Sequence, residues 1–544
     1  SKKVYLDFYT PSFHSLASLA STEPDYPAAL LNLGWPLTTL YLLAFLMLTW
    51  HISRSWIVAV LVALVATWYR QNVIVDDWTL YGLPLPRTLA MPAVVATLFM
   101  WWRTISTDEP HWLWWVSSGL LLGITMNLHP TTGLTLALAL GFMGLILLLK
   151  RGPTLLPSLL LWSISTLLAA SPILLTLAQR SPAVVGQGEF DFKATAEVFI
   201  LRAGAGIIPT QRTDFFNLRL QTEAQIILGL IWLAVNPMLI WRTRRDSART
   251  SLLLLALLQM LFLWLAVRTL RLDMALLLGG GIIWVWLRRP RQDAVLRLWA
   301  WIVACILFVS WPLPMILRVI WWELEIRGLS MFVVELSRGS RLLVPLLYVL
   351  MAIVLSQVLR DLVAWGQQCL AVLRHPAWSW ARVALLSLGL AWAALGLYQA
   401  SARPVEDNRN NTAVMPPLVQ LALWAKENTS VDAVFAYATT SGAPSDMSQF
   451  RYYAQRAISH SHKDLSMVAY SHIQDMIALY DRQVRFAVLS QTPEGVLQLM
   501  EEAQADYVII NYDQVPFENP PVELDEILRV GSFALYRRDS EASS

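Results

Sequence analysis

Long apolar runs recur along the first 400 residues of this chain, and short charged or Pro/Gly-containing segments join them. Runs such as Leu252–Val267 and Val383–Tyr398 approach the roughly 20 apolar residues with which an α-helix crosses a bilayer. Beyond residue 400 the sequence has the mixed polar and apolar pattern of a water-soluble α/β protein. The pattern therefore predicts an α-helical polytopic membrane protein with a small C-terminal α/β domain.

The apolar runs predict about twelve transmembrane helices within residues 33–400, since a helix satisfies its own backbone hydrogen bonds in lipid. The expected helices cover residues 33–50, 56–69, 88–102, 112–128, 130–149, 154–178, 223–241, 252–267, 270–287, 294–311, 341–360 and 383–399. The runs 56–69 and 88–102 are short, so one of them could be re-entrant. Trp and Tyr residues near the helix ends, Trp101 and Trp115 among them, are interpreted first as interfacial anchors.

Two dense basic joints predict the orientation of the bundle. Arg242–Arg245 and Arg288–Arg291 are separated by two helices and so lie on one face, which the positive-inside rule assigns to the cytoplasm. Lys150-Arg151 and Arg54 then lie inside as well. The loops 70–87, 179–222 and 312–340 and the C-terminal domain lie outside. Several outer loops also carry arginines, which could hold a lipid phosphate.

The same orientation places the N-terminal segment 1–32 at the outer face or the membrane interface. A first helix and part of the first outer loop could precede Ser1. The alternative is that Ser1 is a natural start, with Lys2 and Lys3 cytoplasmic and Val4–Ala20 interfacial. We expect the first arrangement.

Residues 401–544 are expected to form a soluble domain after the polar linker Arg403–Asn411. Apolar spacing predicts helices and strands in alternation, which is typical of a small α/β layer. The expected helices are Pro417–Asn428, Leu465–Tyr480 and Pro493–Ala503, and the expected strands are Asp432–Ala438, Asp506–Tyr512 and Ser532–Arg537. No Gly-rich phosphate loop precedes these helices.

Several patterns in both halves are similar to one family of bacterial membrane enzymes. They are Leu421–Ser430, Gln449–Arg456 with Lys463, Asp506–Ile510, Pro84–Arg87 and Asn127-Leu-His129-Pro130-Thr-Thr-Gly133. Together with the helix count they resemble the glycosyltransferase-C type, which uses polyprenyl-phosphate sugars. The resemblance implies an inner-membrane protein with an extracytoplasmic C-terminal domain. It also implies transfer of a sugar to an acceptor on the outer face.

Such a transfer requires a carboxylate to activate the acceptor and a cation to stabilise the departing phosphate. The resemblance implies acids in the first outer loops, and Asp76 and Asp77 in the loop 70–87 are the expected catalytic residues. They could bind a divalent cation, although no metal or other cofactor is assigned. The plainer alternative, which the sequence alone favours, is a solvated turn with a helix-capping aspartate.

Four basic residues near the outer helix ends are the expected phosphate or acceptor contacts: Arg87, His129, Arg268 and Arg271. For His129 the preferred alternative is a cap for the helix break at Pro130. Arg268 and Arg271 could instead pair internally with Asp273.

The soluble domain contains two further polar patterns. His460 and His462, with His472, could bind zinc, but a surface loop is the favoured interpretation because supporting ligands are missing. Arg451, Arg456 and Lys463 could touch a lipid phosphate or an acidic glycan, or could solvate an exposed face.

Two other classes of function remain open. A non-catalytic scaffold or accessory subunit of a larger membrane assembly is favoured by the missing first-loop acids and by the amphipathic stretch 312–340, which could dock another membrane subunit. A transporter is disfavoured because no internal repeat or matched pair of broken helices is visible. The formal charge of +3 and the lack of a basic motif with interleaved aromatics argue against nucleic-acid binding.

Overall fold

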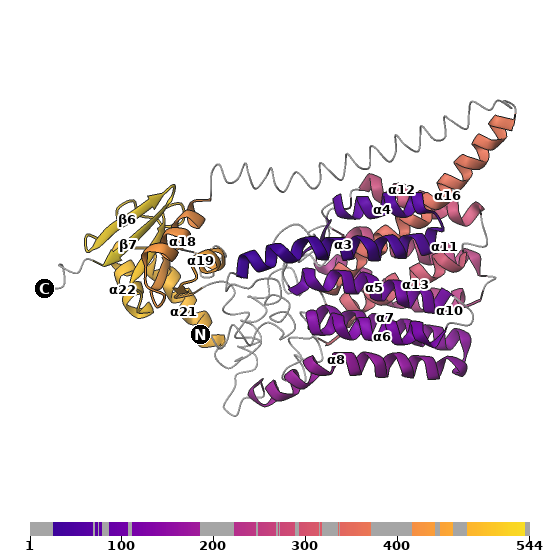
Figure 1. The fold of residues 1–544 in the computed structure, drawn as a ribbon, viewed down its shortest axis with the longest axis horizontal. Coiled ribbons are helices and arrows are strands. Elements are labelled where there is room, and N and C mark those ends of the chain that lie inside the picture. The colour runs from indigo at the N-terminus through magenta and orange to yellow at the C-terminus, as the bar shows by residue number, and fades with distance from the viewer. Residues whose placement is uncertain are drawn as a thin grey trace. The chain divides into compact units, whose positions relative to one another are not determined.

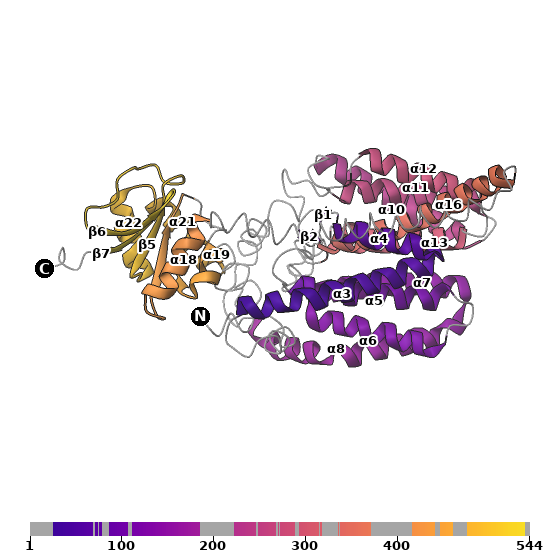
Figure 2. The same cartoon turned by 45° about the horizontal axis from the view of Figure 1, so that its top comes forward.

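A computed structural model of the chain describes the following residues: 26–68, 71–73, 76–78, 86–106, 111–184, 222–245, 248–267, 270, 272–288, 293–314, 316–317, 336, 338–371, 416–440, 447–460 and 476–538. They form a helical bundle and a separate α/β domain (Figures 1 and 2). The expected run 383–399 and the loop 179–222, apart from its two ends, lie outside the described residues.

The bundle is built from apolar helices with one small hairpin. Its helices are α3 (Tyr26–Ser53), α4 (Trp56–Trp68), α5 (Pro86–Ser106), α6 (Trp112–Leu128), α7 (Pro130–Arg151), α8 (Leu156–Val184), α10 (Thr222–Thr243), α11 (Arg249–Ala266), α12 (Leu272–Arg288), α13 (Asp293–Ser310) and α16 (Leu343–Ala371). The 3₁₀ turns η1 (Pro153–Leu155) and η3 (Arg338–Leu342) precede α8 and α16, and β1 (Gln71–Val73) pairs with β2 (Asp76–Trp78) between α4 and α5.

Seven of the described helices are long and apolar enough to cross a membrane, which indicates a membrane protein. The expected total of about twelve spans is not confirmed. Helix α4 has 13 residues, which corresponds to about 20 Å of the roughly 30 Å hydrocarbon core. The apolar part of α12 is likewise short. The region 88–102, by contrast, lies in a candidate span, Leu89–Ser106, of full length.

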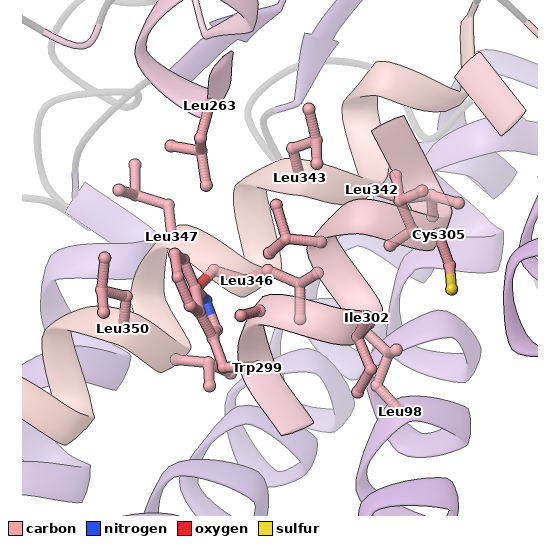
Figure 3. Close-up of a cluster of buried hydrophobic side chains, with 14 of the residues drawn as sticks. Leu98, Leu263, Trp299, Ile302, Cys305, Leu342, Leu343, Leu346, Leu347 and Leu350 are labelled. Carbon is pink, nitrogen blue, oxygen red and sulfur yellow. The ribbon is translucent and has the colours of Figure 1, made fainter. Parts of the chain in front are cut away.

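Helices α13 and α16 form the centre of the bundle. In their apolar windows 83% and 78% of residues are buried, against 28% in the window of α8. Figure 3 shows the side chain of Trp299 on α13 lying among leucines of α16, and its indole N–H donates to the Leu346 carbonyl at 2.8 Å. Helix α8 instead presents leucines outward, among them Leu167 and Leu168. This difference places α13 and α16 inside the protein and one face of α8 toward lipid.

Two tryptophans that the sequence assigned to the membrane interface are core residues. Trp101 and Trp115 are fully buried. Their rings pack edge to face at 5.4 Å between centroids, and the Trp162 ring of α8 lies 4.9 Å from that of Trp101. The expectation of anchoring was wrong for these two residues because α5, α6 and α8 surround them, whereas Trp112 at the start of α6 is exposed.

The joint Arg242–Arg245 lies at the same end of the bundle as other basic helix ends, whereas the joint Arg288–Arg291 lies outside the described residues apart from the backbone of Arg288. Side-chain hydrogen bonds run from Arg360 to the Ser53 carbonyl, from Arg151 to the Ile105 carbonyl and from Arg244 to the Leu149 carbonyl. Arg249 at the start of α11 pairs with buried Asp293 at 2.6 Å between Nε and Oδ2. We call this the basic end; its cationic residues with described side chains are Arg54, Arg103, Lys150, Arg151, Arg242, Arg244, Arg245, Arg249, Arg297 and Arg360.

The α/β domain is a five-stranded sheet with helices on both faces. Its elements are α18 (Pro417–Asn428), β3 (Val434–Ala438), α19 (Met447–Ala454), β4 (Ala457–Ile458), α21 (Met476–Leu489), α22 (Pro493–Ala503), β5 (Tyr507–Asn511), β6 (Leu524–Val530) and β7 (Phe533–Arg538). The strand order is β4-β3-β5-β7-β6. The pairs β3–β4 and β3–β5 are parallel, and β7 is antiparallel to β5 and β6.

The alternation of side chains along β3 divides the core of this domain into two layers. Phe435 and Tyr437 face α18 and α19, while Ala436 and Ala438 face α21 and α22. The predicted ranges of α18 and α22 are confirmed, and β3, β5 and β7 lie where strands were expected. The expected helix 465–480 is described only from Met476, where α21 begins. Strands β4 and β6 and helix α19 were not predicted.

Candidate functional site

At the end of the bundle opposite the basic end, the short turn η3 packs against α7, α13 and α16. A Cβ added at Gly339 would overlap the Cγ2 atom of Thr135 on α7 and would lie 3.4 Å from the Ser310 Cβ of α13. Ser340 and Arg341 are also buried. Glycine at position 339 makes room for this close approach, so η3 packs tightly onto α7 and α13. We call this region the η3 end.

The expected acids Asp76 and Asp77 lie at the η3 end. They belong to β2, which lies beside η3. Figure 2 labels β1 and β2 side by side, and in their antiparallel ladder Asp76 pairs with Val73 and Asp77 pairs with Asn72. The alternative of a turn with a helix-capping aspartate does not fit the backbone, because Asp76 and Asp77 are in a strand and α5 begins only at Pro86.

His129 caps the helix break at this end, as the preferred interpretation predicted. It is extended, with φ −147° and ψ 94°, between the last residue of α6 and the first of α7. Its Nδ1 accepts from the Thr132 backbone N–H at 3.3 Å and from the Thr132 hydroxyl at 2.8 Å. A neutral His129 therefore carries its proton on Nε2. The expected contact between His129 and a phosphate, which would use Nε2, remains a prediction.

Asn127, in the same family-like joint, links α6 to α8. Its Nδ2 donates to the Ala169 carbonyl at 2.5 Å, and its Oδ1 accepts from the Ile173 N–H at 3.1 Å. These two backbone groups flank Pro172, which has no N–H of its own. The side-chain amide therefore reinforces α8 where its backbone bonding is interrupted.

The small residues on the same face of α6 allow this contact. Gly119 and Gly123 precede Asn127 at intervals of four residues, and a Cβ at Gly119 would lie 2.5 Å from the Trp162 carbonyl. Small residues four apart are typical of close helix pairs in membranes. This role was not predicted, although the spacing of Gly119, Gly123 and Asn127 is visible in the sequence.

The remaining basic candidates are only partly described. Arg87 is the second residue of α5, and its side chain lies outside the description. Arg268 and Arg271 lie outside the described residues. Leu270, which lies between them in the sequence, donates its backbone N–H to the Val267 carbonyl at 3.1 Å. Their predicted contacts with phosphate remain predictions.

In the α/β domain Arg456 has a structural role that neither interpretation predicted. Its side chain is buried, with the residue 8% exposed. The guanidinium donates to the Lys426 carbonyl at 2.6 Å and to the Thr429 carbonyl at 2.7 Å. These carbonyls end α18, where a helix leaves its last acceptors without partners. Arg456 therefore neither solvates an exposed face nor lies free to bind a lipid, and Lys463 lies outside the described residues.

His460 is also buried rather than part of a surface loop. The residue is 1% exposed and its ring centroid lies 5.0 Å from that of Phe486. Burial, with a smaller contribution from the charge of Arg482, lowers the pKa of His460 to about 4. His462 and His472 lie outside the described residues, and the described part of the chain contains no group of three metal-ligating side chains.

The carboxyl ends of β3 and β5, where open α/β sheets commonly bind ligands, are bonded to each other. The Thr439 hydroxyl donates to Gln514 Oε1 at 2.6 Å, and the Thr440 hydroxyl donates to the Gln514 carbonyl at 2.8 Å. Asn511 Nδ2 donates to the Tyr437 hydroxyl at 3.2 Å. These polar groups stabilise the sheet, so the η3 end remains the better candidate site.

A second polar network covers β6 and β7. The Tyr536 hydroxyl donates to Glu526 Oε2 at 2.7 Å, and Arg529 Nη2 donates to the Tyr536 hydroxyl at 2.9 Å. The hydrogen bond from Arg529 lowers the pKa of Glu526, whereas burial raises the pKa of Tyr536.

No protein-family model matches this chain, and no curated protein matches it either. A function is therefore proposed from the residues and their geometry.

Proposed function

We propose that this chain is a membrane glycosyltransferase-like protein that transfers a sugar from a polyprenyl-phosphate donor to an acceptor at the η3 end. The observation that carries the proposal is the position of β2, with Asp76 and Asp77, beside η3, which contains Arg338 and Arg341. The strand contains two adjacent aspartates, and the neighbouring turn contains two arginines, of which Arg341 is buried.

The two residue types match the two requirements of the transfer. A carboxylate at Asp76 or Asp77 can take the proton from the acceptor hydroxyl as it attacks the sugar. The sugar–phosphate bond then breaks, and the departing lipid phosphate carries the negative charge that an arginine or a divalent cation stabilises. A carboxylate at either position is an oxygen ligand of the kind that Mg²⁺ and Mn²⁺ accept.

The location of the η3 end supports an outer-face reaction. The cationic joints lie at the other end of the bundle, which the positive-inside rule assigns to the cytoplasm. We therefore place β2 and η3 at the extracytoplasmic surface of a bacterial inner membrane. The acceptor is a lipid, a glycan or a protein, and the C-terminal domain lies on the same side of the membrane in this proposal.

The test is sugar transfer by the purified full chain in lipid nanodiscs. Radiolabelled polyprenyl-phosphate sugars serve as donors, and the parent is compared with Asp76→Asn and Asp77→Asn. Loss of a general base is expected to reduce turnover by about 10² to 10⁴-fold. Asp361→Asn is the matched control, because Asp361 at the basic end accepts hydrogen bonds from Trp284 and Gln357, which asparagine can partly preserve.

Two results would contradict the proposal. Equal turnover in the parent and in both variants would place the acids outside the reaction. No turnover with any donor, together with membrane subunits that co-purify stably, would favour the scaffold or accessory subunit instead.

A further inference from the structure

The ends of α7 and α10 form a cationic surface at the basic end that the proposed function does not use. Arg244 joins the two helices, because its Nη1 donates to the Leu149 carbonyl at 3.2 Å. Its Nε donates to the Trp241 carbonyl at 3.2 Å, and its guanidinium lies 3.1 Å from the Trp241 ring centroid. We define the α7–α10 seam as Lys150, Arg151, Arg242, Arg244 and Arg245.

Three arginines of this seam, Arg242, Arg244 and Arg245, form no ion pair within the part of the chain that the structure describes. Arg242 and Arg245 are exposed, and Arg244 bonds only to carbonyls and to a ring. The joint contains three arginines against the single aspartate Asp246, which lies outside the described residues. Arg249 differs, because it already pairs with Asp293. The seam therefore has a net positive charge with guanidinium N–H groups available.

Exposed apolar side chains lie next to the seam on both helices. Leu145 and Leu149 on α7 and Met238 and Trp241 on α10 are about half exposed, with Leu149 at 59% and Trp241 at 58%. Between the two helices lies Trp301 of α13, which is buried and donates from Nε1 to the Thr243 hydroxyl at 2.9 Å. The Lys150 ammonium lies 5.9 Å from the same indole ring.

We propose that the α7–α10 seam binds the phosphate of an anionic glycerophospholipid, with the acyl chains along the exposed leucines of α7 and Met238 of α10. Guanidinium groups bind phosphate oxygens bidentately, and Arg244 is held in place by its two carbonyl acceptors. A free inorganic anion would gain nothing from the apolar surface beside the seam. Basic pockets between membrane helices on the cytoplasmic side are typical sites for anionic lipid headgroups.

The experiment measures lipid binding to the purified full chain by native mass spectrometry. The probes are dioleoylphosphatidylglycerol and its zwitterionic counterpart dioleoylphosphatidylcholine. The double variant R244Q/R245Q is expected to raise the apparent Kd for phosphatidylglycerol about thirtyfold, since two cations near the phosphate are lost. Arg54→Gln, which removes an exposed charge from the same end outside the seam, is expected to change this Kd less than about twofold.

Arg245→Glu provides a second variant that leaves the fold intact, because the Arg245 side chain is exposed and makes no hydrogen bond among the described residues. It is expected to weaken phosphatidylglycerol binding at least as much as the double variant. The proposal is overturned if the parent binds both lipids equally, or if R244Q/R245Q and Arg245→Glu bind phosphatidylglycerol like the parent. Displacement of the lipid by millimolar inorganic phosphate would assign the seam to soluble anions and would also overturn it.

Discussion

Acidification is expected to destabilise the α/β domain because His460 is buried as a neutral imidazole. The pKa of His460 is about 4 in the folded protein and about 6.5 in the unfolded chain. Since the folded value lies below the unfolded value, the unfolded chain binds a proton in this interval that the folded domain does not. Stability is therefore present above pH 6.5 and is lost as the pH falls toward 4.

The size of the effect follows from the difference between the two pKa values. The interval of 6.5 − 4 = 2.5 units, at about 1.4 kcal/mol per unit, corresponds to about 3 kcal/mol at pH 4 and about 2 kcal/mol at pH 5. Glu502 and Glu526 also have lowered pKa values, so their contributions are lost only below about pH 4.5. Between about pH 7.5 and 5 the change in stability therefore comes from His460 and not from these two carboxylates.

Hydrogen exchange of the full chain in detergent micelles measures this change. The free energy of opening is taken from β3 and β5 amides after correction for the intrinsic exchange rate at each pH. Between about pH 7.5 and 5 the parent is expected to lose about 2 kcal/mol, whereas His460→Gln should lose less than about 0.5 kcal/mol. The comparison uses the slope with pH, because the substitution itself also changes stability. Equal slopes in the two proteins would refute the reasoning.

Two further predictions concern packing and capping. Gly123→Ala would place a Cβ against Ala169 and should destabilise the bundle by about 1 to 3 kcal/mol. The control Gly141→Ala, where no atom lies within 4 Å of the new Cβ, should stabilise the bundle by up to about 1 kcal/mol. Equal melting temperatures of the two variants in detergent would contradict the contact between α6 and α8. Arg456→Met leaves buried carbonyls at the end of α18 without donors and should lower the opening free energy of the domain by about 3 kcal/mol. The control Arg538→Met, at an exposed position, should change the opening free energy by less than about 0.5 kcal/mol. A small loss for Arg456→Met would show that water replaces the guanidinium.

The elements that the sequence predicted well are those with clear local signals. Helix α22 begins after Thr492, which accepts from the Gly495 N–H, and it has proline in its first position. Strand β6 was missed because its alternation is broken. A register shift occurs between Glu526 and Leu528, where two adjacent acidic residues, Asp525 and Glu526, are followed by two adjacent apolar residues, Ile527 and Leu528.

The candidate site was predicted in part, because the sequence identifies residue types but not their long-range neighbours. Asp76 and Asp77 were chosen from their loop position, yet their place beside η3 depends on a segment more than 250 residues later. Arg456 was misread for the same reason, since its carbonyl acceptors lie about 30 residues earlier in the chain. In the sequence, a basic residue that caps the last carbonyls of a distant helix cannot be told from one that binds a ligand.

The sequence positions of the strands mean that the sheet of the α/β domain is completed late in biosynthesis. Strands β5, β6 and β7 all lie between residues 507 and 538, and β5 occupies the middle of the sheet, between β3 and β7. Strand β3, made some 70 residues earlier, therefore has no central partner while the ribosome is still translating that interval. Every described helix of the bundle, by contrast, is complete by residue 371. Insertion into the membrane can thus proceed before this domain closes its core, and a nascent chain stopped before β5 leaves an open sheet edge for chaperones to cover.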